Sequence, residues 1–99
     1  VQWYYIMPAK QKLNLINIMN KEIVENLDKI LPVVERVHSE HHPELHQVAE
    51  LYKEIKEVPS ADSFAKLREV TANYAVPDDA CPTYAKTYEL LETLDKEFA

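Results

Sequence analysis

The chain contains no glycine among its 99 residues. Average usage would place about seven glycines in a chain of this length. Tight two-residue hairpin turns need positive φ at their central residues, and phosphate-binding loops and dinucleotide fingerprints need glycine at fixed positions. We therefore exclude nucleotide-binding loops of these kinds, and we predict an all-α protein in which Pro, Asp and Ser residues form the turns between helices.

Apolar residues recur at steps of three and four along the chain, which is the period of a helix. The spacing predicts helices over Lys10–Ser39, Pro43–Glu57, Ala61–Tyr74 and Pro82–Phe98, and Pro32 should bend the first of them. The predicted inner faces comprise Leu13, Ile16, Met19 or Ile23, Leu27, Ile30 or Leu31, Val34, Val37, Leu45, Val48, Leu51, Tyr52, Ile55, Phe64, Leu67, Val70, Thr71, Tyr84, Tyr88, Leu91, Leu94 and Phe98.

Four amphipathic helices joined by short links are typical of an up-down-up-down four-helix bundle. The length allows a single domain over residues 1–99. Within it, we expect residues 1–12 to form an irregular or capping segment and residues 13–98 to form the bundle.

The chain is acidic, with a net charge of −6 and a pI of about 5.1. A nucleic-acid groove needs clustered Lys and Arg, and an anionic membrane surface also attracts basic chains. No apolar run reaches the roughly 18–20 residues of a membrane span, and Val1–Met7 is too short for a signal-peptide core. One cysteine, Cys81, cannot form an internal disulfide. We expect no nucleic-acid or membrane partner and a cytoplasmic location.

All four histidines lie within one stretch of nine residues, at the corner where the first predicted helix ends and the second begins. They are His38, His41, His42 and His46. Imidazole commonly binds borderline metals, and residues four apart share one face of a helix. The segment is therefore either a mononuclear transition-metal site or a solvated corner whose histidines cap helix ends.

Each of the other candidate residues has two possible roles. Cys81 is either a packed cysteine or a reactive thiol at a helix start. Asp78 and Asp79 suit the capping of the fourth helix better than acid–base catalysis, which needs a cleft. The tyrosines at positions 52, 74, 84 and 88 suit a core with hydroxyls reaching the surface better than a substrate pocket. No catalytic residue is predicted, and enzyme activity is left open.

Two segments resemble a known family. The first, Arg36-Val37-His38-Ser39-Glu40-His41-His42-Pro43-Glu44-Leu45, is similar to the helix 1–helix 2 corner of the hemerythrin-like di-iron proteins that repair iron–sulfur clusters. The family pattern there is Arg-Val-His-Gly, two variable residues, then His-Pro-Glu-Leu. The second, Leu67–Tyr74 with Pro77–Tyr84, is similar to the family's helix 3–helix 4 corner. The resemblance covers residues 17–98, without the family's cysteine-bearing N-terminal module.

The resemblance implies a non-haem di-iron centre held by histidines and bridging glutamates inside the bundle. It also implies that the protein restores iron–sulfur clusters damaged by oxidative or nitrosative stress, through iron delivery to the damaged proteins. His38 matches a histidine that ligates iron in the family, and it is the one metal ligand that we predict.

Most of the family's other ligand segments have no match in this sequence. Met19 and Asn20 stand where the family has a His-His pair, and Val58-Pro59 interrupts the ligand segment of the second helix. The third helix opens with only Asp62, and the fourth stops at Phe98-Ala99 before its ligand pair. In an up-down-up-down bundle these four places lie at one pole, so we expect a bundle shortened at its metal-binding pole.

Three explanations fit these gaps: the chain is part of a longer repair protein, it is a degenerate or engineered bundle, or it shares only the fold. We expect this chain to bind two irons weakly or not at all. The alternative function is a metal-free helical interaction module, in which Trp3-Tyr4-Tyr5 covers a bundle end or docks a partner. A homodimer is compatible with either function.

Overall fold

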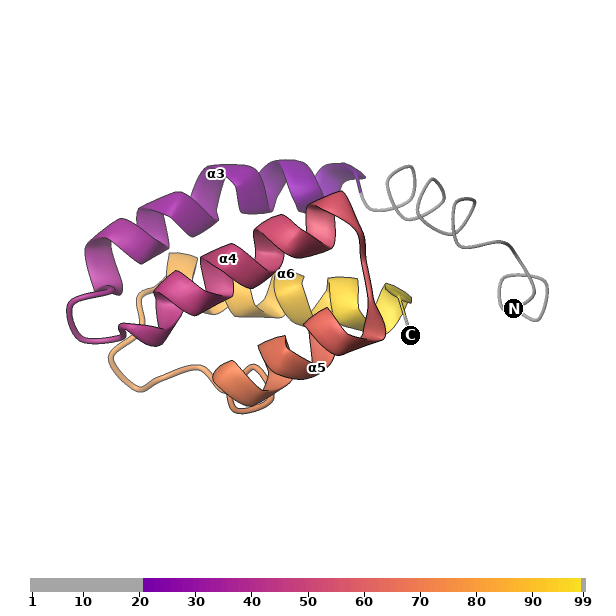
Figure 1. The fold of residues 1–99 in the computed structure, drawn as a ribbon. Coiled ribbons are helices and arrows are strands. Elements are labelled where there is room, and N and C mark those ends of the chain that lie inside the picture. Colours follow the sequence, from indigo (N-terminus) through magenta and orange to yellow (C-terminus); the bar gives the residue numbers. More distant parts are fainter. Residues whose placement is uncertain (1–20, 99) are drawn as a thin grey trace, which may run out of the picture.

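The structure, a computed structural model, describes residues 21–98. Four helices make up this part: α3 (Lys21–His38), α4 (Glu44–Glu57), α5 (Ala61–Val70) and α6 (Pro82–Phe98) (Figure 1). No strand occurs between residues 21 and 98. The predicted all-α class is confirmed for this range. The predicted helix start at Lys10, the 1–12 segment, Trp3–Tyr5, Leu13, Ile16 and positions 19 and 20 lie outside the described residues.

The helix starts follow from local sequence. Ser60 has extended backbone and its Oγ accepts a hydrogen bond from the Ser63 N–H at 3.1 Å, so it is a standard N-cap for α5. Pro43 directly precedes α4, and Pro82 is the first residue of α6, where a missing N–H costs nothing. Inside α3, the helix continues through Pro32 rather than ending there.

The third helix is shorter than predicted, because it ends at Val70 instead of Tyr74. Ala72, Asn73 and Tyr74 have φ values of 52°, 58° and 62°, so they form a left-handed turn without glycine. The buried Thr71 supports this turn: its hydroxyl donates to the Leu67 carbonyl at 2.7 Å and accepts from the Tyr74 N–H at 3.0 Å. Hydrogen bonds of the Thr71 side chain thus stabilise a helix end at which glycine is commonly found.

The core fills the space between the four helices, and most of the predicted inner faces are confirmed. It consists of Leu27, Leu31, Val34, Leu45, Val48, Leu51, Tyr52, Ile55, Phe64, Leu67, Tyr74, Tyr84, Tyr88, Leu90, Leu91 and Leu94. Val37 was predicted to face inward, but it is 60% exposed. The last turn of α3 faces inward through His38, whose ring contacts Tyr84, and Val37 lies about 100° around the helix from it.

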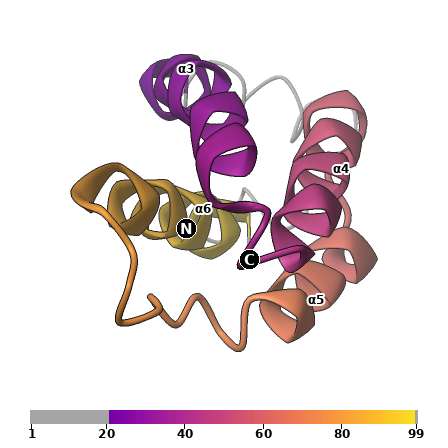
Figure 2. The same cartoon turned by 90° about the vertical axis from the view of Figure 1, so that its left-hand side faces the viewer.

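The helices surround a common interior, as the end-on view of Figure 2 shows. α3 packs against α4 and α6, and α4 also packs against α5. The turn over residues 39–43 and the link between α5 and α6 lie at the same end of the molecule (Figure 1). The short link between α4 and α5 lies at the opposite end, where Phe64 stacks on Phe98 with ring centroids 5.1 Å apart. None of the helices described here has the length and apolar character to cross a bilayer.

Candidate functional site

The two segments that carry the family resemblance meet at one end of the helices. His38, the last residue of α3, places its Nε2 atom 3.3 Å from the Sγ atom of Cys81. His42 follows in the next turn, and its Nε2 atom lies 2.9 and 3.0 Å from the two carboxylate oxygens of Asp79. The two contacts join the end of α3 and the turn after it to the link before α6. Two side-chain pairs therefore hold this end of the molecule together.

Cys81 occupies the N-cap position of α6. Its carbonyl accepts a hydrogen bond from Ala85 at 3.0 Å, and its sulfur accepts one from the Tyr84 N–H at 3.4 Å. Cys81 is half-buried, and its thiol is free. The Cys81 sulfur thus lies 3.4 Å from the Tyr84 backbone nitrogen and 3.3 Å from the His38 Nε2 atom. Cys81 therefore packs at a helix start, and its reactivity stays a prediction.

The Tyr84 ring packs directly against the rings of both histidines. Its side chain is fully buried, and its ring makes edge contacts with His38 and His42 at centroid distances of 5.1 and 5.5 Å. Tyr88 lies beneath it, with ring centroids 5.1 Å apart. Burial raises the pKa of the Tyr84 and Tyr88 phenols, so both stay protonated at neutral pH. The prediction that the four tyrosines are core residues is confirmed, but the hydroxyls of Tyr74, Tyr84 and Tyr88 are buried and do not reach the surface.

Asp79 does not cap α6, contrary to the prediction, because its carboxylate binds His42. The hydrogen bond that His42 donates to the Asp79 carboxylate raises the pKa of His42, and the Asp79 and Glu44 charges add to this while desolvation opposes it. The same hydrogen bond lowers the pKa of Asp79. Glu44, at the first position of α4, lies 3.5 Å from the other ring nitrogen of His42. When protonated, the positively charged His42 imidazole therefore lies between two carboxylates, those of Asp79 and Glu44.

We expect the ion pair between His42 and Asp79 to stabilise the fold most in mildly acidic solution. Because the pKa of folded His42 is raised above 6.5, its contribution is complete below pH 6.5 and is lost as the pH rises through the folded value. Because the pKa of folded Asp79 is lowered below 3.8, its contribution is present above pH 3.8 and is lost as the pH falls through the folded value.

Urea unfolding at several pH values measures this effect. The loss of unfolding free energy in Asp79→Asn should be larger at pH 5 than at pH 8.5. The control is Asp62→Asn, which alters an exposed pair with Lys66 at 3.2 Å and should show no such difference. An equal loss of unfolding free energy at both pH values for Asp79→Asn would argue against a stabilising His42–Asp79 ion pair.

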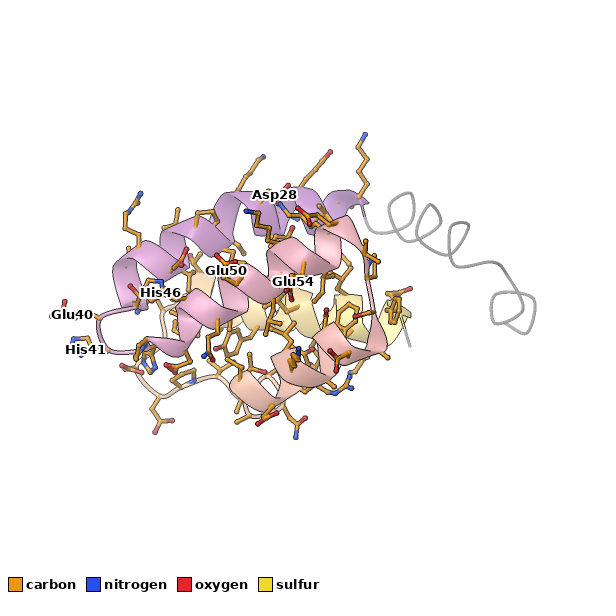
Figure 3. All side chains as sticks on the ribbon, in the orientation of Figure 1. Asp28, Glu40, His41, His46, Glu50 and Glu54 are labelled. Atoms are coloured by element: carbon orange, nitrogen blue, oxygen red, sulfur yellow. The ribbon has the colours of Figure 1, made fainter. Side chains whose placement is uncertain are left out.

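The other two histidines point elsewhere. His46 binds Glu35 through Nδ1 at 2.8 Å, on the outside of α3 and α4. Figure 3 shows His41 and Glu40 directed away from the helices at the 39–43 turn. No group of three or more His, Cys, Asp or Glu side chains within residues 21–98 is arranged to hold a metal ion. The structure therefore does not bring the four histidines together as a mononuclear site.

The described residues also do not fit a di-iron centre, which needs His and Glu side chains converging from all four helices. Every His, Cys, Asp and Glu of the sequence lies within the described range, because residues 1–20 contain none. Toward the end away from the histidines, two of the aspartates already have partners: Asp95 binds Arg68 and Tyr74, and Asp28 binds Tyr52.

Sequence reasoning selected His38 but did not predict its partner. Cys81 and His38 are 43 residues apart, and Asp79 and His42 are 37 apart. The available signal was Pro82, whose place at a helix start puts Cys81 at the N-cap. Comparisons of the chain with family models, with curated proteins and with solved structures found no match. The family resemblance therefore stays a prediction.

Proposed function

We propose that this chain is a hemerythrin-like bundle of the iron–sulfur cluster repair type, in which His38 and Cys81 hold one iron ion for transfer. Iron is the cargo of such a protein rather than a resident di-iron cofactor. The recipients are damaged iron–sulfur proteins in the cytoplasm. The single observation that carries the proposal is the 3.3 Å approach of the His38 Nε2 atom to the Cys81 Sγ atom.

The helix directions support the hemerythrin-like part of the proposal. In Figure 1, α3 and α4 run in opposite senses, as do α4 and α5, and α5 and α6. This is the order expected for an up-down-up-down bundle. The two corners that resemble the repair family lie at the same end, as that topology requires, and side-chain contacts join them.

The donor geometry supports a shared metal ion. For tetrahedral metal bonds of about 2.05 Å to nitrogen and about 2.3 Å to sulfur, the two donor atoms lie about 3.6 Å apart. The observed separation of 3.3 Å needs only a small side-chain movement to reach that value. Imidazole and thiolate together suit iron and zinc better than magnesium or calcium. Two protein ligands leave other coordination positions open, which suits release to a recipient.

Metal titration of single variants tests the pair. Fe²⁺ binding under anaerobic conditions should weaken at least about tenfold in His38→Ala, which corresponds to about 1.4 kcal/mol. Cys81→Ser should show a similar loss and should also lack the sulfur-to-metal absorption band that we expect when Co²⁺ is bound in place of Fe²⁺. His41→Ala is the matched control and should bind like the parent, because His41 points into solvent. Equal affinity of the His38 and His41 variants would refute the site.

Transfer is tested with an iron–sulfur protein from which one iron has been removed. The iron-loaded chain should restore the cluster of this recipient faster than the same amount of iron held by a small chelator. His38→Ala should lose this advantage, and His41→Ala should keep it. If the chain binds iron but all samples restore the cluster equally fast, the protein is a metal-binding bundle without a repair function.

The alternative function is a metal-free interaction module, and the contacts of the histidines favour it. His42 and His46 already bind carboxylates, and His38 already contacts a thiol. These pairs fasten helix ends without any metal. The titration separates the two functions, because a pure interaction module would bind Fe²⁺ no more tightly than the double variant lacking both His38 and Cys81.

A further inference from the structure

A groove of about 490 Å³ runs between α4 and α5. Its apolar floor includes Leu51 and the half-buried Val70. Its walls carry His46, Gln47, Glu50, Glu54, Lys66 and Glu69. Figure 3 shows His46, Glu50 and Glu54 in a row along α4, four residues apart.

The groove carries negative charge without counter-ions. Glu50, Glu54 and Glu69 are exposed, and none of them forms an ion pair with another residue in the range 21–98. The one lysine of the groove, Lys66, is engaged with Asp62 at 3.2 Å. An apolar floor flanked by free carboxylates suits an apolar segment that carries positive charge.

Residues 1–20 of the same sequence have that character. Twelve of the twenty are apolar, the charged residues are Lys10 and Lys12, and there is no Asp or Glu. Residues 21–99 hold the other nine basic and all seventeen acidic residues, which gives them a net charge of −8. The chain thus contains both a basic apolar segment and an acidic groove.

We propose that the α4–α5 groove binds residues 1–20 of a second copy of this chain. No proline or glycine lies between Lys10 and Lys21, and the helical period predicts that one helix continues through this stretch into α3. In the same chain, Lys21 begins α3, which packs against α4 and α6, whereas the groove lies between α4 and α5. Reciprocal exchange between two copies gives a closed two-fold dimer.

Charge exchange in the full chain tests this dimer by sedimentation equilibrium. Glu50→Lys/Glu54→Lys reverses the groove, and Lys10→Glu/Lys12→Glu reverses the segment. Each variant alone should dimerise at least tenfold more weakly than the parent. An equimolar mixture should recover the dimer, because each groove then meets a segment of opposite charge. Glu89→Lys/Glu97→Lys makes the same change of charge on exposed residues of α6 and should dimerise like the parent.

Trp3, the only tryptophan, reports where the segment lies. Its emission should shift to shorter wavelength as the dimer forms, relative to a peptide of residues 1–20. A parent protein that stays monomeric would overturn the proposal, and a shielded Trp3 in that monomer would place the segment on its own chain. A dimer that survives groove reversal unchanged would also overturn it. Circular dichroism verifies that the reversed variants keep their helices, since Glu and Lys have similar helix propensity.

Discussion

Replacing Tyr84 with alanine should lower the free energy of unfolding by about 3–5 kcal/mol, the range for removing a large aromatic side chain from a core. Tyr84 is fully buried, and its ring contacts Tyr88 and both His38 and His42. The change leaves a cavity beneath the candidate site, so Fe²⁺ binding should weaken as well. Urea unfolding and metal titration of the same preparation measure both effects.

Tyr84→Phe is the matched control for this prediction. It keeps the ring and removes only the hydroxyl, which within residues 21–98 forms one side-chain hydrogen bond, with the Tyr88 hydroxyl at 3.5 Å. We expect a loss below about 1 kcal/mol and unchanged Fe²⁺ affinity. If Tyr84→Ala lost no more stability than Tyr84→Phe, the ring would not be the support that positions the two histidines.

Replacing Asp95 with asparagine should cost about 2–4 kcal/mol of unfolding free energy. Asp95 is 6% exposed, and its oxygens accept two hydrogen bonds from the Arg68 guanidinium at 2.8 Å and one from the Tyr74 hydroxyl at 2.7 Å. The amide keeps the shape but loses the charge that strengthens all three bonds. Arg68 is partly exposed, so water can solvate its unpaired charge and limit the loss.

The same Asp95 contacts hold the left-handed turn after α5, because Tyr74 is the last residue of that turn. Burial and the hydrogen bond to Asp95 raise the pKa of the Tyr74 phenol, which therefore remains a donor at neutral pH. Amide hydrogen exchange of residues 71–75 should accelerate in Asp95→Asn. Thr93→Val, which removes an exposed bond within α6, should change neither property, and an Asp95→Asn protein as stable as the parent would contradict this account.

The helices and most of the core followed from the sequence because the apolar period and the proline positions act locally. The end of the third helix did not, since no glycine or proline marks Val70 as its last residue. Its end depends on a Thr71 side chain that folds back on the helix and on a Tyr74 hydroxyl that reaches α6. The first bond is local but has no distinctive pattern, and the second depends on tertiary packing.

The candidate site was predicted only in part for the same reason. The histidine-rich segment was recognisable, and His38 was selected from it by resemblance. The partner residues Cys81 and Asp79 are far from the histidines in the sequence. Their contacts with His38 and His42 depend on how α6 packs against α3. Spacing along a sequence carries no information about that packing, so Asp79 was assigned to a helix cap that Cys81 occupies instead.

Iron K-edge X-ray absorption of the Fe²⁺-loaded chain tests the central claim most directly, because it identifies the atoms bound to the metal. We predict no more than one iron per chain, with one sulfur neighbour at about 2.3 Å and one imidazole. The sulfur should disappear in Cys81→Ser. A spectrum with an iron–iron vector and only nitrogen and oxygen neighbours would mean a di-iron centre, and it would contradict the assignment of His38 and Cys81 as the iron-binding pair.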